Sequence, residues 1–137
     1  MKAFVVREGR LLLVREAEGE RCWELPGGRI EVGEESSPPV AVLGRELAEE
    51  LGPSFEVEIG RPVLTWIRPP EPPRRVDPVF LVGFLCRYSR GEIVLSPEHV
   101  EFRWVTRPDC AGLHLAPGYG PSLEQFWLAT QAGSGSV

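Results

Sequence analysis

The stretch GRELAEELG, residues 44–52, decides the fold because it combines a helical pattern with an unusual concentration of acid. Its leucines recur at helical spacing and form one apolar face, so the segment is predicted to be an amphipathic helix. Glu46, Glu49 and Glu50 lie largely off that face and repel one another, and the last two fall in the final turn, where the helix dipole disfavours anions. This arrangement costs stability unless a cation compensates for it.

The helix is predicted to begin before this stretch and to cover residues 40–51. Ser37 can cap its N-terminus, and the two prolines that follow suit a first turn. Gly52, followed by a proline, ends the helix. Upstream, RCWELPGG at residues 21–28 is predicted to be a short strand that runs into a tight turn.

Apolar runs on both sides of this helix predict strands. The first two, residues 2–6 and 11–16, are separated by a turn that contains Gly9, and we expect them to form a hairpin. Four more strands are expected at residues 55–67, 76–88, 92–96 and 101–107. A closing helix, capped by Ser122, is expected at residues 120–132. Strands followed by a helix, twice over, indicate a mixed sheet covered by helices.

Length and composition limit the class of protein. With 137 residues, 42% of them hydrophobic, we expect one domain over residues 1–131 and a flexible tail at 132–137. The net charge of -5 argues against binding of a nucleic acid polymer, which needs a concentrated excess of Lys and Arg. No segment approaches the roughly 20 apolar residues that cross a bilayer, so we expect a cytoplasmic protein with no membrane partner. Three scattered cysteines without a CxxC pair predict reduced, structural thiols.

The acidic helix by itself has two interpretations. Clustered carboxylates are hard oxygen ligands that suit Mg²⁺ or Mn²⁺, and the glycine-rich turn before the helix lets backbone approach a ligand closely. A Glu-rich helix can equally be an ordinary solvated face, which is the commoner case when such a helix is considered alone. The surrounding pattern has to decide between them.

That pattern resembles the Nudix box, the signature of MutT-like hydrolases that act on nucleoside diphosphates linked to another group. GGRIEVGE at residues 27–34 supplies Gly28 and Glu34 of the box, and RELAEELG at residues 45–52 supplies its helix. The resemblance extends over most of the chain, including WELPGG before the box and SPEHVEFRWV at residues 96–105. Family membership implies an α/β (α+β) fold, an α/β/α sandwich with a mixed sheet, in which the box forms a loop-helix-loop metal site.

The box carries a three-residue insertion. Ten residues, 35–44, separate Glu34 from Arg45, where the family pattern has seven. The insertion includes SSPP, so we expect a longer loop before an intact helix, and either Glu34 or Glu35 can be the partner of Arg45. The final apolar position of the box is occupied by Pro53.

The resemblance implies a role for each box residue. Glu46, Glu49 and Glu50 would hold the metal or, for one of them, activate water, with Glu49 and Glu50 as principal ligands and Glu46 as ligand or base. Glu46, Glu49 and Arg45 form the expected catalytic set. Arg45 would orient this catalytic cluster through Glu34 or its neighbour. Further residues are implied in the same way: a backbone carbonyl at Gly28 near the metal and a structural helix end at Gly52. Glu98 would be an extra carboxylate ligand or base, with a solvated loop acid as the alternative.

The expected function is therefore hydrolysis of a pyrophosphate bond in a nucleotide or nucleotide derivative, with Mg²⁺ or Mn²⁺ as cofactor. The alternative is a catalytically inactive domain of the same fold that binds a nucleotide-like ligand or a protein partner. The expected partner is a small-molecule nucleotide-type substrate, and the protein is a monomer or a homodimer. The substrate-binding residues are unknown at this level.

Several other residues are open to two interpretations. His99 is interpreted as a surface or packing residue, and the four tryptophans as core. Arg68, Arg74 and Arg75 flank a proline-rich connector that is expected to be an exposed, stiffened loop. They can contact phosphates, but a solvated charge cluster is the simpler interpretation.

Overall fold

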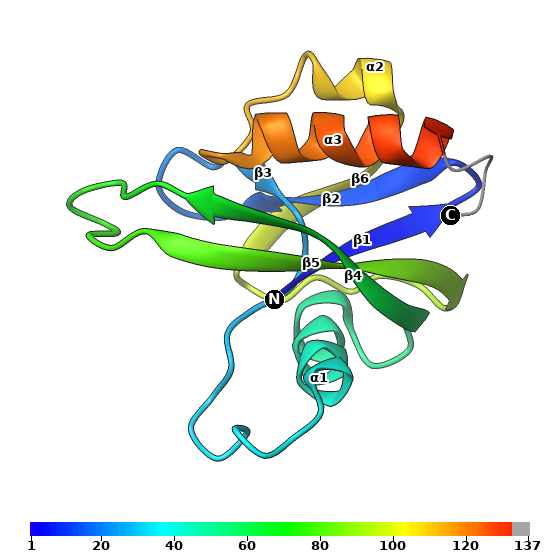
Figure 1. Cartoon of the computed structure of the whole chain (residues 1–137). Coiled ribbons are helices and arrows are strands. Elements are labelled where there is room, and N and C mark those ends of the chain that lie inside the picture. Colours follow the sequence, from blue (N-terminus) through cyan, green and yellow to red (C-terminus); the bar gives the residue numbers. More distant parts are fainter. Residues whose placement is uncertain (133–137) are drawn as a thin grey trace.

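The computed structural model describes residues 1–132 of the chain, and its elements follow the expected order (Figure 1). Six strands and three helices are formed within these residues: β1 (Lys2–Arg7), β2 (Arg10–Glu16), β3 (Trp23–Glu24), α1 (Pro39–Leu51), β4 (Glu56–Arg68), β5 (Val79–Arg90), β6 (His99–Val105), α2 (Arg107–Cys110) and α3 (Tyr119–Ala132).

The sheet is mixed, as predicted. Its main path runs β3-β2-β1-β5-β4, and β6 pairs with β2. Strands β1 and β5 run parallel, and every other strand pair is antiparallel. The predicted hairpin of β1 and β2 forms through Glu8 and Gly9, both with positive φ. A glycine at the second of these positions is the usual solution for a two-residue hairpin turn.

Helices cover both faces of the sheet, so the α/β/α sandwich is confirmed. Figure 1 shows α1 on one side and α3, with the short α2, on the other. Two separate apolar clusters fill the layers: one under α3 that includes Phe4 and Phe126, stacked at 4.5 Å, and one under α1 that includes Leu43 and Leu47. Burial of these side chains provides the main stabilisation of the sandwich.

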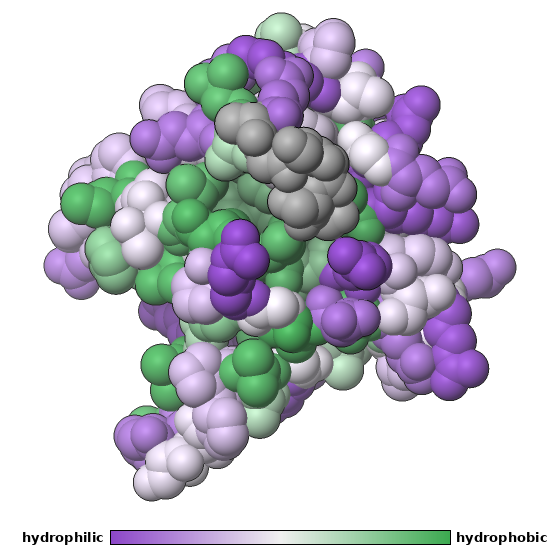
Figure 2. All heavy atoms as spheres, turned by 45° about the vertical axis from the view of Figure 1, so that its right-hand side comes forward, coloured by the Kyte–Doolittle hydropathy of each residue, from purple (hydrophilic) through white to green (hydrophobic). Residues whose placement is uncertain are grey.

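Three tryptophans are in the core, as expected: Trp23, Trp66 and Trp127 are less than one-tenth exposed. Trp104 is half-buried and packs against the cluster under α1. Some large apolar side chains are exposed, among them Phe80 and Ile67, which are cross-strand partners. Figure 2 shows apolar side chains in the middle of one face of the molecule, surrounded by hydrophilic ones.

Both predicted serine caps are wrong. The N-cap of α1 is Pro38, with extended φ and ψ and no side-chain cap bond, because the proline pair itself sets the backbone for the first turn. Ser122 lies inside α3, where its hydroxyl donates to the carbonyl of Tyr119 at 2.9 Å. The predicted end of α1 is confirmed, since Gly52 follows it with φ of 92°.

The strand expected at residues 92–96 does not form. The amide of Val94 donates to the carbonyl of Leu51 at 3.0 Å, and that of Ser96 donates to the carbonyl of Glu50 at 3.1 Å. The segment thus satisfies backbone carbonyls at the end of α1 instead of pairing with a strand. Helix α2 was not predicted, because a single turn leaves too little periodicity.

The predicted tail falls mainly outside the described residues. Of residues 132–137, only Ala132 is described, as the last residue of α3. Among residues 1–132, no helix has both the length and the apolar character needed to span a bilayer.

Candidate functional site

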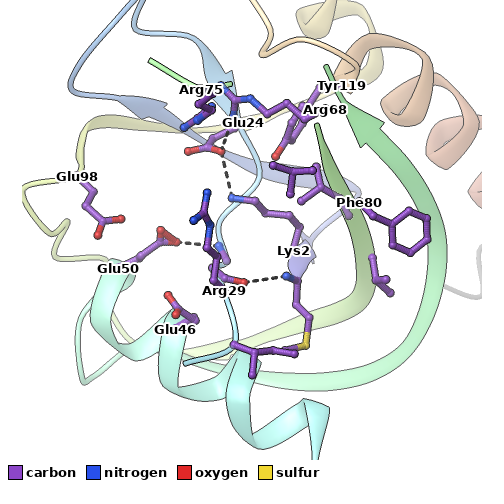
Figure 3. Close-up of a pocket in the computed structure, with 17 residues that line it drawn as sticks. Lys2, Glu24, Arg29, Glu46, Glu50, Arg68, Arg75, Phe80, Glu98 and Tyr119 are labelled. Carbon is purple, nitrogen blue, oxygen red and sulfur yellow. Dashed lines mark hydrogen bonds and ion pairs between the residues drawn. The ribbon is translucent and has the colours of Figure 1, made fainter. Parts of the chain in front are cut away.

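A cavity of about 640 Å³ opens beside the start of β1 and the end of α1. Figure 3 shows Glu46, Glu50 and Glu98 along one side and the side chain of Lys2 across the middle, with Arg68 beyond it. Glu46, Glu50 and Glu98 therefore gather at one end of the cavity, and Arg68 lies at the other, where Glu24 pairs with it and with Lys2. Such a site can receive a ligand that carries a metal ion and negative charge together.

The glycine-rich turn forms the floor of the carboxylate end. It is anchored to β1, because the amide of Ala3 donates to the carbonyl of Pro26 at 2.8 Å. The amide of Gly27 donates to Oε1 of Glu50 at 2.7 Å, which ties the turn to α1. Gly28 lies so close to α1 that a Cβ at this position would collide with the carboxylate of Glu46. A larger residue at this position would force the Glu46 carboxylate to move.

Two of the box carboxylates are removed from water. Glu50 is 3% exposed, and burial raises its pKa to about 7, although Lys2 and the Gly27 amide act in the opposite direction. Burial also raises the pKa of Glu46. Carboxylates that resist ionisation in this way gain from a nearby cation. The carboxylates of α1 therefore need a compensating cation, as the sequence of this helix predicts.

Arg45 meets Glu34 and not Glu35. Its Nε lies 2.6 Å from Oε2 of Glu34, and a terminal nitrogen lies 2.7 Å from Oε1. The same guanidinium contacts Glu46 at 2.9 Å and Glu49 at 3.1 Å. Glu35 instead accepts from the amide of Gly33. The inserted residues lengthen the loop and leave the box pairing intact.

Some of the predicted site residues line the cavity, and others lie outside it. Glu46, Glu50, Glu98 and Gly28 line the cavity, whereas Glu49 is 56% exposed in its side chain, is held by Arg45, and is not among the lining residues. Acidic ligand atoms of Glu49, Glu46 and Glu31 lie within 4.8 Å of one another, which defines a second carboxylate group. Gly52 ends α1 and takes no part in the cavity.

Glu98 is brought to the cavity by the segment that covers the end of α1. Its carboxylate and that of Glu50 lie within 4.8 Å of each other and of a ring nitrogen of His99. His99 is 5% exposed, and its Nε2 lies 3.0 Å from Oε2 of Glu24. His99 is therefore not a surface residue, and its ring nitrogens lie toward two buried acids, Glu24 and Glu50.

A buried ion-pair network lies behind the cationic end of the cavity. Arg68 is 4% exposed and contacts Glu16 at 3.3 Å, Glu24 at 3.5 Å and Glu71 at 2.8 Å. Arg75 contacts Glu16 at 3.0 Å. The interpretation as a solvated charge cluster is wrong for Arg68. The connector at 68–75 is fastened to the sheet by these pairs.

Sequence reasoning missed the acids that this network uses. Glu16 and Glu24 are both buried, at the ends of strands whose other residues are mostly apolar. A charged residue inside an apolar run is seldom buried without a partner. That signal was available in the sequence, but the partner, Arg68, is more than forty residues away and could not be identified from it.

The donor set fits a divalent metal ion. Three carboxylates and a backbone carbonyl supply hard oxygen ligands, the type that Mg²⁺ and Mn²⁺ prefer. The carbonyl of Gly28 accepts from the Met1 ammonium at 2.8 Å, so a metal ion bound to this oxygen would take the place of that cation.

Comparisons with known proteins agree with this geometry. A family model described as NUDIX domain matches residues 2–126. A MutT-like protein from Streptomyces ambofaciens is 35% identical over 120 residues, which cover 87% of this chain and 70% of that protein.

Solved structures share the fold. The E. coli ORF135 protein is 26% identical, with a TM-score of 0.69 over 99% of this chain and 91% of that one. An ADP-ribose pyrophosphatase from Streptococcus suis is 27% identical, with a TM-score of 0.59 over 86% of this chain and 76% of that one.

Proposed function

The chain belongs to the Nudix hydrolase family, and on that premise we propose that it is a Mg²⁺- or Mn²⁺-dependent hydrolase that cleaves a pyrophosphate bond in a nucleotide or nucleotide derivative. Pyrophosphate hydrolysis in general follows from the family. The observation that supports the finer proposal is the cavity, which sets buried carboxylates opposite buried cations.

The metal would be held by carboxylates of α1 and the loop before β6. We propose Glu49, Glu50 and Glu98 as the acidic ligands, with the carbonyl of Gly28, and keep Glu46 beside them for the base. To bind the metal, the Glu49 side chain has to break its ion pair with Arg45 and turn toward the cavity. A bound divalent ion supplies charge neutralisation for the diphosphate and lowers the pKa of the attacking water.

We assign proton transfer, alignment of the loop and phosphate binding to side chains of the protein. Glu46 is proposed as the base that takes the proton of water as the water oxygen attacks phosphorus, because it lines the cavity and burial raises its pKa. Arg45 keeps the loop and α1 in register through Glu34. Arg29, next to Gly28, extends into the cavity (Figure 3) and can pair with a phosphate of the substrate.

The box insertion gives no reason to prefer the non-hydrolytic alternative. The longer loop still places a glutamate at Arg45, since Glu34 makes this contact through two hydrogen bonds.

A substrate panel tests the proposal. Nucleoside triphosphates, ADP-ribose, dinucleoside polyphosphates and nucleotide sugars are assayed for release of phosphate, pyrophosphate or nucleoside monophosphate, with Mg²⁺ or Mn²⁺ and with EDTA. We expect metal-dependent release from at least one compound and loss of at least 100-fold in Glu50→Gln, since removal of a group that acts on the transition state costs factors of this order. Equal background release by the wild type and Glu50→Gln on every compound would refute the hydrolase.

A further inference from the structure

His99 stands between two buried carboxylates that belong to different parts of the site. Its Nε2 lies 3.0 Å from Oε2 of Glu24, and its Nδ1 lies 3.7 Å from Oε2 of Glu50. Nδ1 is buried and has no hydrogen-bond partner within the described part of the chain. Buried polar nitrogens without a hydrogen-bond partner are uncommon in native structures, and those that occur often have a functional role.

Glu24, the first of these carboxylates, is itself fixed. Its Oε1 lies 3.1 Å from Nζ of Lys2 and 3.5 Å from Arg68, and all three side chains are mostly buried. The imidazole of His99 is thus fastened to a rigid group, and rotating the ring away from Glu50 would break the contact with Glu24.

Glu50 is approached from two sides. Its Oε1 accepts from the Gly27 amide, and its Oε2 faces Nδ1 of His99. A shift of about half an ångström would bring this second contact into hydrogen-bond range. The carboxylate therefore has a defined orientation, with the turn below it and the imidazole beside it.

His99 also anchors the loop that carries Glu98. The amide of His99 donates to the carbonyl of Ser96 at 3.2 Å, and the amide of Ser96 donates to the carbonyl of Glu50 at 3.1 Å. The amide of Ala17 donates to the carbonyl of Glu98 at 2.9 Å. Glu98 is consequently presented beside Glu50 by residues that are tied to α1 and to the end of β2.

We propose that His99 is a positioning residue, which fixes the Glu50 carboxylate and the Glu98 loop toward the divalent cation without binding the cation itself. This inference rests on the metal site of the proposed function. Outer-shell groups that orient metal-binding carboxylates commonly contribute about 10- to 100-fold to metal affinity. Glu24 fixes the imidazole of His99 and therefore also affects the orientation of Glu50 at the metal site.

Two substitutions at this position separate positioning from simple packing. His99→Gln places a polar group near Nε2 and keeps the contact with Glu24, but it has no atom in place of Nδ1. His99→Asn places a polar group near Nδ1, toward Glu50, and gives up Glu24. The matched control is His114→Gln, because His114, the second of two histidines in the chain, is 64% exposed in its side chain and contacts the exposed Glu20.

The measurements are Mn²⁺ affinity, from the free-ion electron paramagnetic resonance signal, and urea unfolding of the metal-free protein. We expect His99→Gln to be the more stable variant but to bind Mn²⁺ about tenfold more weakly than wild type. His99→Asn should be the less stable variant and should keep more of the Mn²⁺ affinity. His114→Gln should match wild type in both. Raising Mn²⁺ should restore most of the hydrolytic rate of His99→Gln.

Three results would overturn the inference. The first is wild-type Mn²⁺ affinity in both His99 variants, which would leave only a packing role. The second is an affinity ranking that follows the stability ranking. The third is nitrogen coupling to bound Mn²⁺ in the electron spin echo spectrum of wild type that disappears in both variants, which would make His99 a direct ligand. If the wild-type protein binds no Mn²⁺ at all, the metal site of the proposed function has failed, and this failure is distinct from the other three.

Glu24→Gln provides an independent check through a double-mutant cycle with His99→Gln. If Glu24 acts through the imidazole, the loss of Mn²⁺ affinity in the double variant should be smaller than the product of the two single losses. Multiplicative losses would contradict the chain from Glu24 through His99 to Glu50.

Discussion

The guanidinium of Arg45 and the carboxylate of Glu34 form a two-point ion pair, with nitrogen-oxygen distances of 2.6 and 2.7 Å. The pair holds the last part of the loop at residues 25–38 against the middle of α1, and the Arg45 hydrogen bonds lower the pKa of Glu34. Figure 1 shows this loop extending away from the sheet before it returns to α1. The extra residues therefore enlarge the loop beyond the pair, while the pair keeps the turn and the helix in register.

Removal of this pair should impair hydrolysis much more than it impairs folding. Glu34→Gln loses the charge but keeps the shape, so we expect the Arg45 guanidinium to turn toward Glu46 and Glu49 and kcat to fall about tenfold or more. Unfolding by urea should change little, because the pair lies at the surface. Glu35→Gln is the control, since Glu35 contacts only backbone of its own loop. Equal losses in the two variants would show that Arg45 does not select Glu34.

Gly28→Ala should disrupt the carboxylate end of the cavity. A methyl group at this position would collide with the carboxylate of Glu46, so we expect Mn²⁺ affinity and kcat to fall at least tenfold. Gly120→Ala in α3 is the matched control, because a Cβ there meets no atom within 4 Å and alanine favours a helix. The control should keep full activity and be as stable as wild type or more so. A Gly28→Ala protein with wild-type Mn²⁺ affinity would refute the role of this close approach.

The elements of the fold could be predicted because each rests on local information. The apolar periodicity of α1, the Gly9 turn and the long apolar runs of β4 and β5 depend on residues close in sequence. The errors have different causes: Pro38 takes the cap position expected for Ser37, and α2 is too short to show periodicity. Residues 92–96 have strand composition, but their backbone groups bond to the end of α1, and this tertiary contact overrides local preference.

The site could be predicted only where a known pattern covers it. The box glutamates, Arg45 and Gly28 follow from one stretch of sequence. His99 and Arg68 do not, because their significance arises from Glu24, which reaches one of them from 75 residues away and the other from 44. Ion pairs between residues so far apart in sequence leave no local pattern that would predict them. A buried acid in an apolar strand indicates that a partner exists without identifying it.

Arg68 should be essential for stability. Arg68→Met keeps an apolar stem but takes a cation from each buried acid, although Glu16 keeps Arg75 and Glu24 keeps Lys2. Removing one member of a buried pair costs about 3–5 kcal/mol, and the cations that stay bring the expected loss to the lower end, about 3 kcal/mol. We expect a loss of this size in the free energy of unfolding by urea. Arg90→Met is the matched control, since Arg90 pairs with Glu56 on the surface, and that variant should unfold like wild type. Equal midpoints for the two variants would contradict the structural role assigned to the buried network.

Glu50 should give the metal-free protein a characteristic pH dependence. Its pKa is raised in the folded state from 4.5 to about 7, so the folded protein binds this proton more tightly than the unfolded chain does. The resulting stability is fully present below pH 4.5 and is lost as the pH rises through 7. The loss is on the order of 3 kcal/mol. Glu50→Gln cannot titrate at this position and should not show it.

The measurement is the difference in unfolding free energy between wild type and Glu50→Gln, in EDTA, from pH 4.5 to 8. Glu24, whose pKa is lowered, acts in the opposite sense but is present in both proteins. Glu50 also helps to raise the pKa of His99, so the comparison is repeated in a His99→Gln background, where the difference isolates Glu50. We expect wild type to lose stability relative to Glu50→Gln across this range and to regain it above pH 7 when Mg²⁺ is added, because the ion replaces the proton. A difference that stays flat with pH, or a recovery of equal size in Glu50→Gln, would show that Glu50 is not the carboxylate whose burial the metal compensates.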